Sequence, residues 1–171
     1  MKRRLAWLLA VGWLASWSVL ADVYQTPEDF VREALAKPEA AQSLWLTGEV
    51  KKSIRTILGR DYQNLRLKYW RNGAKSIWVL DDIGKDEYIT LGFVIQNQQI
   101  EQSKVLVFRE SRGWEIKFPS FAQQFLGARL SDTLQLDRKV DGITGATLSV
   151  NAYERLARLA LVLDRAAHAQ E

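Results

Sequence analysis

The residues best suited to chemistry lie in one short stretch, Asp141-Gly142-Ile143-Thr144-Gly145-Ala146-Thr147-Leu148-Ser149. A charge-rich segment precedes it and a long run of helical apolar periodicity follows, so we expect a loop that enters a helix. Its glycines and other small residues let a ligand approach the backbone closely. A phosphate placed here would meet free backbone N–H groups and the positive end of the helix dipole. The stretch therefore predicts a site for a phosphate-bearing group, with threonine hydroxyls and a carboxylate within reach.

This stretch resembles the flavinylation motif of the FMN-binding domain family, Asp-x-x-(Ser/Thr)-Gly-Ala-Thr. That family includes the periplasmic flavin subunits of the Rnf complex and of the sodium-translocating NADH:quinone oxidoreductase. In the family, a flavin transferase joins FMN through its phosphate to the last threonine of the motif, which here is Thr147. The resemblance implies covalent FMN at Thr147, a flavin transferase as partner, and cofactor-binding roles for Asp141, Thr144, Gly145, Ala146, Leu148 and Ser149.

An ordinary helix cap is the alternative interpretation of the same residues. Thr144 or Thr147 would then accept a hydrogen bond from a backbone N–H, and the glycines would only turn the chain. The protein would be a non-redox binding or sensory module of the same fold, with Thr147 unmodified. We favour flavinylation, because the full pattern opens a helix in a chain that begins like an exported protein.

A second candidate segment, Phe108-Arg109-Glu110-Ser111-Arg112-Gly113-Trp114-Glu115, follows an expected strand. The family carries Glu-Thr-Pro-Gly-Leu-Gly at the corresponding place, and the match of Glu110, Ser111 and Gly113 implies that Glu110 and Ser111 lie near the flavin. Arg112 replaces the proline and Glu115 the second glycine, so the resemblance assigns no role to either residue. A surface loop with a satisfied carboxylate is the alternative.

Residues 1–21 have the pattern of an export signal. Lys2, Arg3 and Arg4 precede an apolar run from Leu5 to Leu20, and Val19-Leu20-Ala21 forms a small-residue cleavage site before Asp22. An uncleaved membrane anchor is the alternative, because the run approaches the ~20 residues that span a bilayer. We favour cleavage and a periplasmic location, with residues 22–171 forming the mature domain.

Composition excludes several classes of function. The chain has no cysteine and one histidine, His168, which argues against disulfides, thiolate metal sites and cysteine-ligated clusters. Removing the three leader cations from the 24 basic residues leaves 21, against 20 acidic residues. Such a balance gives no sign of nucleic-acid binding. Redox chemistry would therefore depend on an organic cofactor or on a partner.

The sequence also bears on the source of electrons. It contains no Gly-x-Gly-x-x-Gly fingerprint for a nicotinamide cofactor, and export would separate it from the cytosolic NADH pool. The resemblance implies an electron carrier or redox subunit more than a stand-alone enzyme. Its expected partner is a membrane-bound redox protein that gives or takes electrons.

Periodicity predicts a single α+β domain in which an antiparallel meander of about four strands packs with helices. Thr26-Pro27 begins a helix that stops at Lys37-Pro38, residues 40–46 form a short helical or irregular piece, and residues 51–58 form a helix closed by Gly59. The expected strands are 65–70, 76–80, 88–95 and 100–108, with a hairpin at Asn72-Gly73 and a polar turn at 81–86.

The C-terminal part is expected to be helical. Residues 118–127 predict a short helix in which Phe118, Phe121 and Phe125 are core residues more than flavin contacts, because helical aromatic stripes are usually buried. A long helix follows, with an apolar face formed by Leu148, Ala152, Leu156, Leu159 and Leu163. Residues 166–171 are expected to fray.

Overall fold

The computed structural model describes residues 21–35 and 40–170, so the expected leader, apart from Ala21, and the expected stop at Lys37-Pro38 lie outside it. Its elements are, in order, β1 (Asp22–Val23), α1 (Pro27–Ala34), β2 (Gln42–Trp45), α2 (Gly48–Leu58), β3 (Arg66–Asn72), β4 (Lys75–Ile83), β5 (Tyr88–Gln96), β6 (Gln99–Phe108), α3 (Pro119–Ala122) and α4 (Thr147–Ala169). Two 3-10 turns, η1 (Trp114–Lys117) and η2 (Gln123–Phe125), flank α3.

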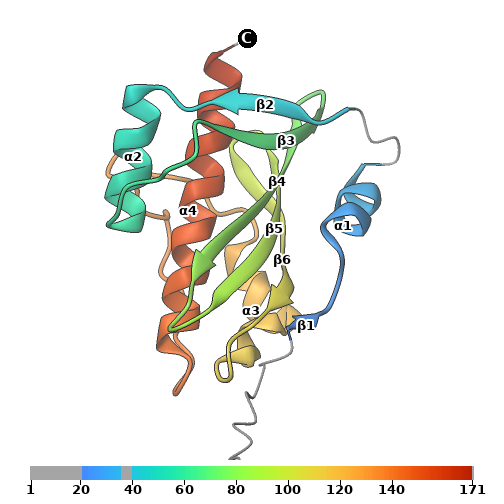
Figure 1. Cartoon of the computed structure of the whole chain (residues 1–171), viewed down its shortest axis with the longest axis vertical. Coiled ribbons are helices and arrows are strands. Elements are labelled where there is room, and N and C mark those ends of the chain that lie inside the picture. The colour runs from blue at the N-terminus through green and yellow to red at the C-terminus, as the bar shows by residue number, and fades with distance from the viewer. Residues whose placement is uncertain (1–20, 36–39, 171) are drawn as a thin grey trace, which may run out of the picture.

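The strands form one six-stranded antiparallel sheet in the order β1-β6-β5-β4-β3-β2 (Figure 1). Tight turns connect its central strands: Gly73 turns β3 into β4, and Asn97 and Gln98 join β5 to β6. Both residues of the second turn have positive φ, 51° and 59°, as a two-residue hairpin of matching twist requires. The α+β class is confirmed, with six strands in place of about four.

Three strands differ from the prediction: β1 and β2 are additional, and β4 is longer than expected. Residues 42–45, expected to be helical or irregular, form β2, in which Leu44 pairs with Leu67 of β3 and is buried. Four residues are too few to display a period of two, so only the pairing with β3 defines this strand. Strand β4 continues through the expected polar turn to Ile83, because Asp82 is buried against two arginines instead of turning toward water.

The helix boundaries follow their caps. Thr26 begins α1 by accepting a hydrogen bond from the Asp29 N–H at 3.1 Å. Helix α2 starts at Gly48, three residues earlier than expected, because Thr47 accepts from the Val50 N–H, and it ends at Gly59 with φ 68°. Helix α4 continues to Ala169, and burial of Ala167 explains why the expected fraying from residue 166 is wrong.

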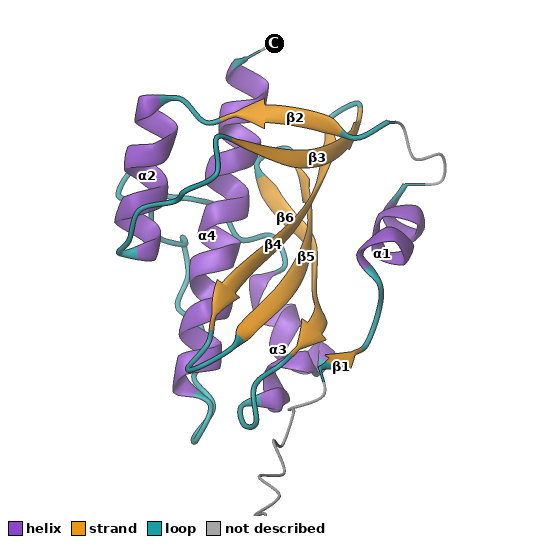
Figure 2. Cartoon of the chain, in the orientation of Figure 1, coloured by secondary structure: helices purple, strands orange, loops and turns teal. Residues whose placement is uncertain are grey.

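Helices cover both faces of the sheet (Figure 2). Helices α2 and α4 pack together on one face, with α4 running across β4 and β5. Helix α1 covers the opposite face, where Phe30 packs over Gly92 so closely that a Cβ there would lie 2.5 Å from the ring. The sheet thus holds α4, and with it the expected cofactor loop, in a fixed position.

The aromatic residues near α3 divide into two groups. Phe121 and Phe125 are buried against Tyr153 of α4, with ring centroids 5.3 and 4.4 Å away, as expected for core residues. Phe118 is 45% exposed, so the expectation that it belongs to the core is wrong. It precedes the four-residue helix α3 in an extended conformation and so lies off the buried stripe.

A buried carboxylate lies near the far end of α4. Asp164 is fully buried and accepts hydrogen bonds from the Ser76 hydroxyl and the Gln98 amide, while His168 Nδ1 lies 3.6 Å from its Oδ1. Burial raises the pKa of Asp164 above its ordinary value of 3.8, although the Ser76 hydrogen bond and the nearby His168 and Arg71 lower it in part.

This raised pKa predicts a pH dependence of stability. The native state binds the Asp164 proton more tightly than the unfolded state, so the stabilisation is present at low pH and is lost as the pH rises through the native pKa. An Asp164→Asn variant keeps an acceptor for Ser76 and does not titrate. We expect the unfolding free energy of the wild type minus that of the variant to fall with pH in urea titrations from pH 3.5 to 7. A difference that rises with pH would contradict this assignment.

Candidate cofactor site

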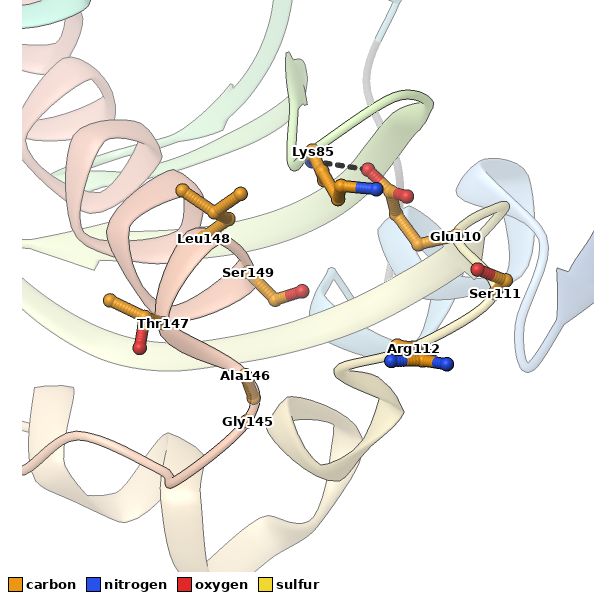
Figure 3. Close-up of a pocket in the computed structure, with 9 residues that line it drawn as sticks. All are labelled: Lys85, Glu110, Ser111, Arg112, Gly145, Ala146, Thr147, Leu148 and Ser149. Atoms are coloured by element: carbon orange, nitrogen blue, oxygen red, sulfur yellow. Dashed lines mark hydrogen bonds between the residues drawn. The ribbon is translucent and has the colours of Figure 1, made fainter.

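Three segments that are distant in the sequence meet at a pocket of about 510 Å³ (Figure 3). They are the β4–β5 turn, the loop after β6, and the first turn of α4. The lining residues are Lys85, Glu110, Ser111, Arg112, Gly145, Ala146, Thr147, Leu148 and Ser149. Seven of the nine expected site residues therefore lie around one cavity, whose volume suits a small-molecule ligand.

The first turn of α4 has no side-chain cap. Its N-cap residue is Ala146, and no side chain accepts a hydrogen bond from the helix's leading N–H groups. Threonine side chains cap α1 and α2 in the same chain, whereas α4 begins without such a cap. The alternative in which Thr144 or Thr147 caps this helix does not describe the structure. These N–H groups and the helix dipole remain available to an anion at this end of the helix.

Thr147 is the first residue of α4 and is exposed. Its hydroxyl makes no hydrogen bond to any residue that the structure describes. The preceding Gly145 has φ 84°, and a Cβ there would meet no other atom within 4 Å. The backbone before Thr147 is therefore open, and an incoming group can reach the hydroxyl without displacing a side chain.

Gly113 fixes the loop after β6 against α4. A Cβ at Gly113 would lie 2.2 Å from Ser149 Oγ and 3.0 Å from Ser149 Cβ, and Gly113 also has φ 85°. Ser149 is 4% exposed, so its side chain has little room to move. Only glycine combines this close approach with this backbone conformation.

We expect Gly113→Ala to destabilise the protein by roughly 2 kcal/mol, since a left-handed L-residue alone costs about 1–2 kcal/mol and the contact with Ser149 adds to it. Gly142→Ala is the matched control, because no atom lies within 4 Å of its Cβ position and its φ is not positive. Chemical denaturation of both variants tests the prediction. Equal denaturation midpoints for the two variants would show that the position of the loop does not depend on the close approach of Gly113 to Ser149.

Glu110 holds the β4–β5 turn in place. Its Oε1 accepts backbone hydrogen bonds from Lys85, from Asp86 at 2.8 Å and from Glu87 at 3.0 Å, and the residue is 9% exposed. The carboxylate therefore lies at the edge of the pocket and is engaged by the turn. Its contribution to the site is to position Lys85.

Glu110→Ala should release that turn. The amides of Lys85, Asp86 and Glu87 lose their shared acceptor, and we expect their hydrogen exchange to accelerate by at least about tenfold, in line with the loss of charge-assisted hydrogen bonds. Glu110→Gln retains an acceptor oxygen and should show a smaller effect. Unchanged exchange in the alanine variant would contradict the positioning role.

The remaining two expected site residues lie apart from the pocket wall. Asp141 and Thr144 are exposed and do not line the cavity. The backbone of the motif is nevertheless held, because the Asp141 N–H donates to Gln124 Oε1 at 2.7 Å. Gln124 thus anchors the loop that leads to Thr147, a role that sequence reasoning did not assign to it.

Two cationic residues of the pocket were also missed. Arg112 is exposed and forms no ion pair within the described residues, while Lys85 pairs with Asp86 at 2.9 Å on the surface. Arg112 departs from the family pattern, so the resemblance assigns it no role, and nothing in the local sequence marks Lys85. Beside an uncapped helix N-terminus, both side chains favour a ligand that carries negative charge.

An open hydroxyl, free helix N–H groups and two cations define a site for a phosphate-bearing cofactor. Residues 84–162 match the family model of the FMN-binding domain, and this match spans the pocket-lining segments from Lys85 to Ser149. Residues 84–162 are thus similar to an FMN-binding domain, and this match supports FMN as the cofactor. The residues present fit that group, since the phosphate has N–H donors and cations to meet.

No curated protein matches the chain. Among the helices in the described parts of the chain, none is long and apolar enough to cross a bilayer. Within residues 21–35 and 40–170, no three acidic, histidine or cysteine side chains gather as a metal site would require.

Proposed function

We propose that this protein is an extracytoplasmic electron-transfer flavoprotein that carries FMN in a phosphoester to Thr147. One observation supports this most directly: the motif's last threonine is exposed and unbonded at the first position of an uncapped helix, inside the segment that matches an FMN-binding domain. A hydroxyl used as a cap would be hydrogen-bonded to the helix. The free hydroxyl of Thr147 is suited to modification instead.

The chain's own residues would seat the cofactor at its phosphate. Attachment would transfer a flavin mononucleotidyl group from a flavin dinucleotide donor: the Thr147 oxygen would bond to the FMN phosphorus, the pyrophosphate bond of the donor would break, and a nucleoside monophosphate would leave together with the hydroxyl proton. The remaining phosphate charge would face the α4 N–H groups, with Arg112 and Lys85 nearby. A flavin transferase would carry out the attachment, recognising the exposed Asp141 and Thr144 outside the pocket wall. The bound flavin would supply the electron chemistry.

The proposed electron partner is a membrane-bound redox protein. The protein lacks a nicotinamide-binding fingerprint, and an exported domain would have no access to cytosolic NADH. Electron exchange between proteins needs only a small, transient contact. Reduced flavoprotein should therefore exchange electrons with a membrane fraction, while NADH alone reduces it slowly. Rapid, saturable reduction of the purified protein by NADH would contradict the electron-carrier function and indicate that the protein is an oxidoreductase that uses NADH.

Intact mass is the decisive measurement for cofactor attachment. The protein is produced with and without a flavin transferase and exported, and we expect an added flavin mononucleotidyl group only when the transferase is present. Flavin that washes off in denaturant would indicate non-covalent binding. A protein without flavin in both preparations would favour the binding or sensory module. N-terminal sequencing of the same sample should begin at Asp22 if the leader is removed.

A further inference from the structure

Four side chains, two exposed and two half-buried, form a surface cluster outside the lining of the cofactor pocket. This aromatic–lysine patch consists of Tyr24, Trp114, Lys117 and Phe118. The rings of Trp114 and Phe118 meet edge to face at 5.6 Å, and both residues remain more than two-fifths exposed, at 43% and 45%. Lys117 Nζ lies 4.6 Å from the Tyr24 ring centre, 4.9 Å from that of Trp114 and 6.0 Å from that of Phe118.

The patch lies beside the cofactor pocket. Trp114 follows Gly113, the residue that packs against Ser149 in the first turn of α4. Arg112, one residue earlier, lines the pocket itself. A surface that contacts Trp114 therefore also comes close to the flavin site.

The N-terminal segment enters the domain at the same end. Asp22 and Val23 of β1 pair with Phe108 and Val107 of β6, and Tyr24 belongs to the patch. The apolar run from Leu5 to Leu20 ends one residue before the described chain begins at Ala21. If this run is retained as an anchor, the bilayer lies only a few residues along the chain from Tyr24 of the patch.

The composition of the patch is that of a lipid interface. Tryptophan and tyrosine concentrate where headgroups meet acyl chains, because their rings are apolar and their edges polar. A lysine beside them keeps its charge in the headgroup layer while its stem lies on apolar surface. Two large aromatic side chains this exposed on a folded domain would lose water on entering such an interface.

We propose that the aromatic–lysine patch binds the interfacial layer of a lipid bilayer and so holds the flavin pocket toward the membrane. The contact of the patch with lipid stands independently of the flavin. Its purpose, presenting the cofactor to a membrane-bound electron partner, rests on the proposed function. Binding is weak and reversible, because the patch offers two inserting rings and one cation.

Tryptophan quenching by lipid tests the proposal. The exported protein is mixed with protein-free vesicles of phosphatidylethanolamine and phosphatidylglycerol whose acyl chains carry bromine, which quenches tryptophan on contact. The wild type is compared with Trp114→Phe and with Trp45→Phe. Trp45 is the matched control, because it is 58% exposed but lies on β2 at the opposite edge of the sheet from β1. Any leader tryptophans contribute equally to all three proteins.

We expect the quenchable fluorescence to fall in Trp114→Phe and to persist in Trp45→Phe. A double variant, Trp114→Ser with Phe118→Ser, should bind the same vesicles about tenfold more weakly in flotation assays, in keeping with the loss of both inserting rings. Circular dichroism confirms that each variant is folded, and intact mass of each preparation reports flavin attachment separately. If the wild type carries covalent flavin but its tryptophan fluorescence is not quenched by the brominated lipid, the membrane contact is rejected and the proposed flavin attachment is not.

Three outcomes overturn the proposal. Equal loss of quenching in the Trp114 and Trp45 variants would mean that lipid contact is not specific to the patch. A dimer in light scattering that the double variant abolishes would assign the patch to a second copy of the chain. Binding to native membranes, with none to protein-free vesicles, would assign it to a protein partner.

Discussion

Thr147→Ala is expected to abolish covalent flavin and to leave a folded, colourless protein after a denaturing wash. The substitution removes the oxygen that would form the phosphoester. It should change the unfolding free energy by no more than about 0.5 kcal/mol, because Thr147 is exposed, its hydroxyl is unbonded, and alanine favours helix. In-gel fluorescence and intact mass report attachment, and thermal denaturation reports the fold.

Two controls separate chemistry from structure at this position. Thr147→Ser keeps a hydroxyl on the Cβ atom of the same residue and should retain covalent flavin. Thr144→Ala removes the motif's other threonine hydroxyl, which lies outside the pocket wall, and should not shift the attachment point. Covalent flavin retained in Thr147→Ala would refute the proposed linkage, and its loss in Thr147→Ser would point to recognition by the transferase.

Asp82→Ala is expected to cost about 3 kcal/mol of unfolding free energy, the largest effect among the variants that preserve the pocket residues. Asp82 is 2% exposed and pairs with Arg155 Nε at 2.6 Å and with Arg60 Nη2 at 2.8 Å. Arg155 also donates to the Ile83 carbonyl at 2.9 Å. The carboxylate thereby ties α4 to the end of β4, directly before the turn that carries Lys85.

The expected loss of unfolding free energy depends on the two arginines that Asp82→Ala leaves without their carboxylate partner. Breaking a buried ion pair by removing one partner typically costs about 3–5 kcal/mol. The lower end applies, because the Arg155 and Arg60 side chains are 26% and 42% exposed and regain water. For a domain of this size, we expect the melting temperature to fall by roughly 10 °C.

Asp61→Ala is the matched control for Asp82→Ala. Asp61 pairs with Arg55 at 3.3 Å while both side chains are more than 60% exposed, so its loss should cost less than about 1 kcal/mol. Similar losses for the two variants would show that the Asp82 pairs contribute no more than surface contacts. Faster hydrogen exchange in the β4–β5 turn of Asp82→Ala would show that the ion pairs of Asp82 also order the part of the pocket that carries Lys85.

Local signals were enough to predict the central elements of this protein. Thr26-Pro27, Gly59 and Asn72-Gly73 act through their own backbone and nearest neighbours, so their caps and turns are readable in sequence. The motif from Asp141 to Ser149 likewise marked the start of α4 and the expected cofactor loop. Each of these inferences depends on residues that are close to each other in the sequence.

Tertiary structure decided what depends on distant partners. Leu44 belongs to a strand only because β3 lies beside it, and Asp82 remains in β4 because Arg155, 73 residues later, reaches its carboxylate. Lys85 joins the pocket because Glu110 accepts its backbone N–H across 25 residues. Hydrogen bonds and ion pairs of this kind require a folded sheet to bring their partners together, and no local pattern of residue types encodes them.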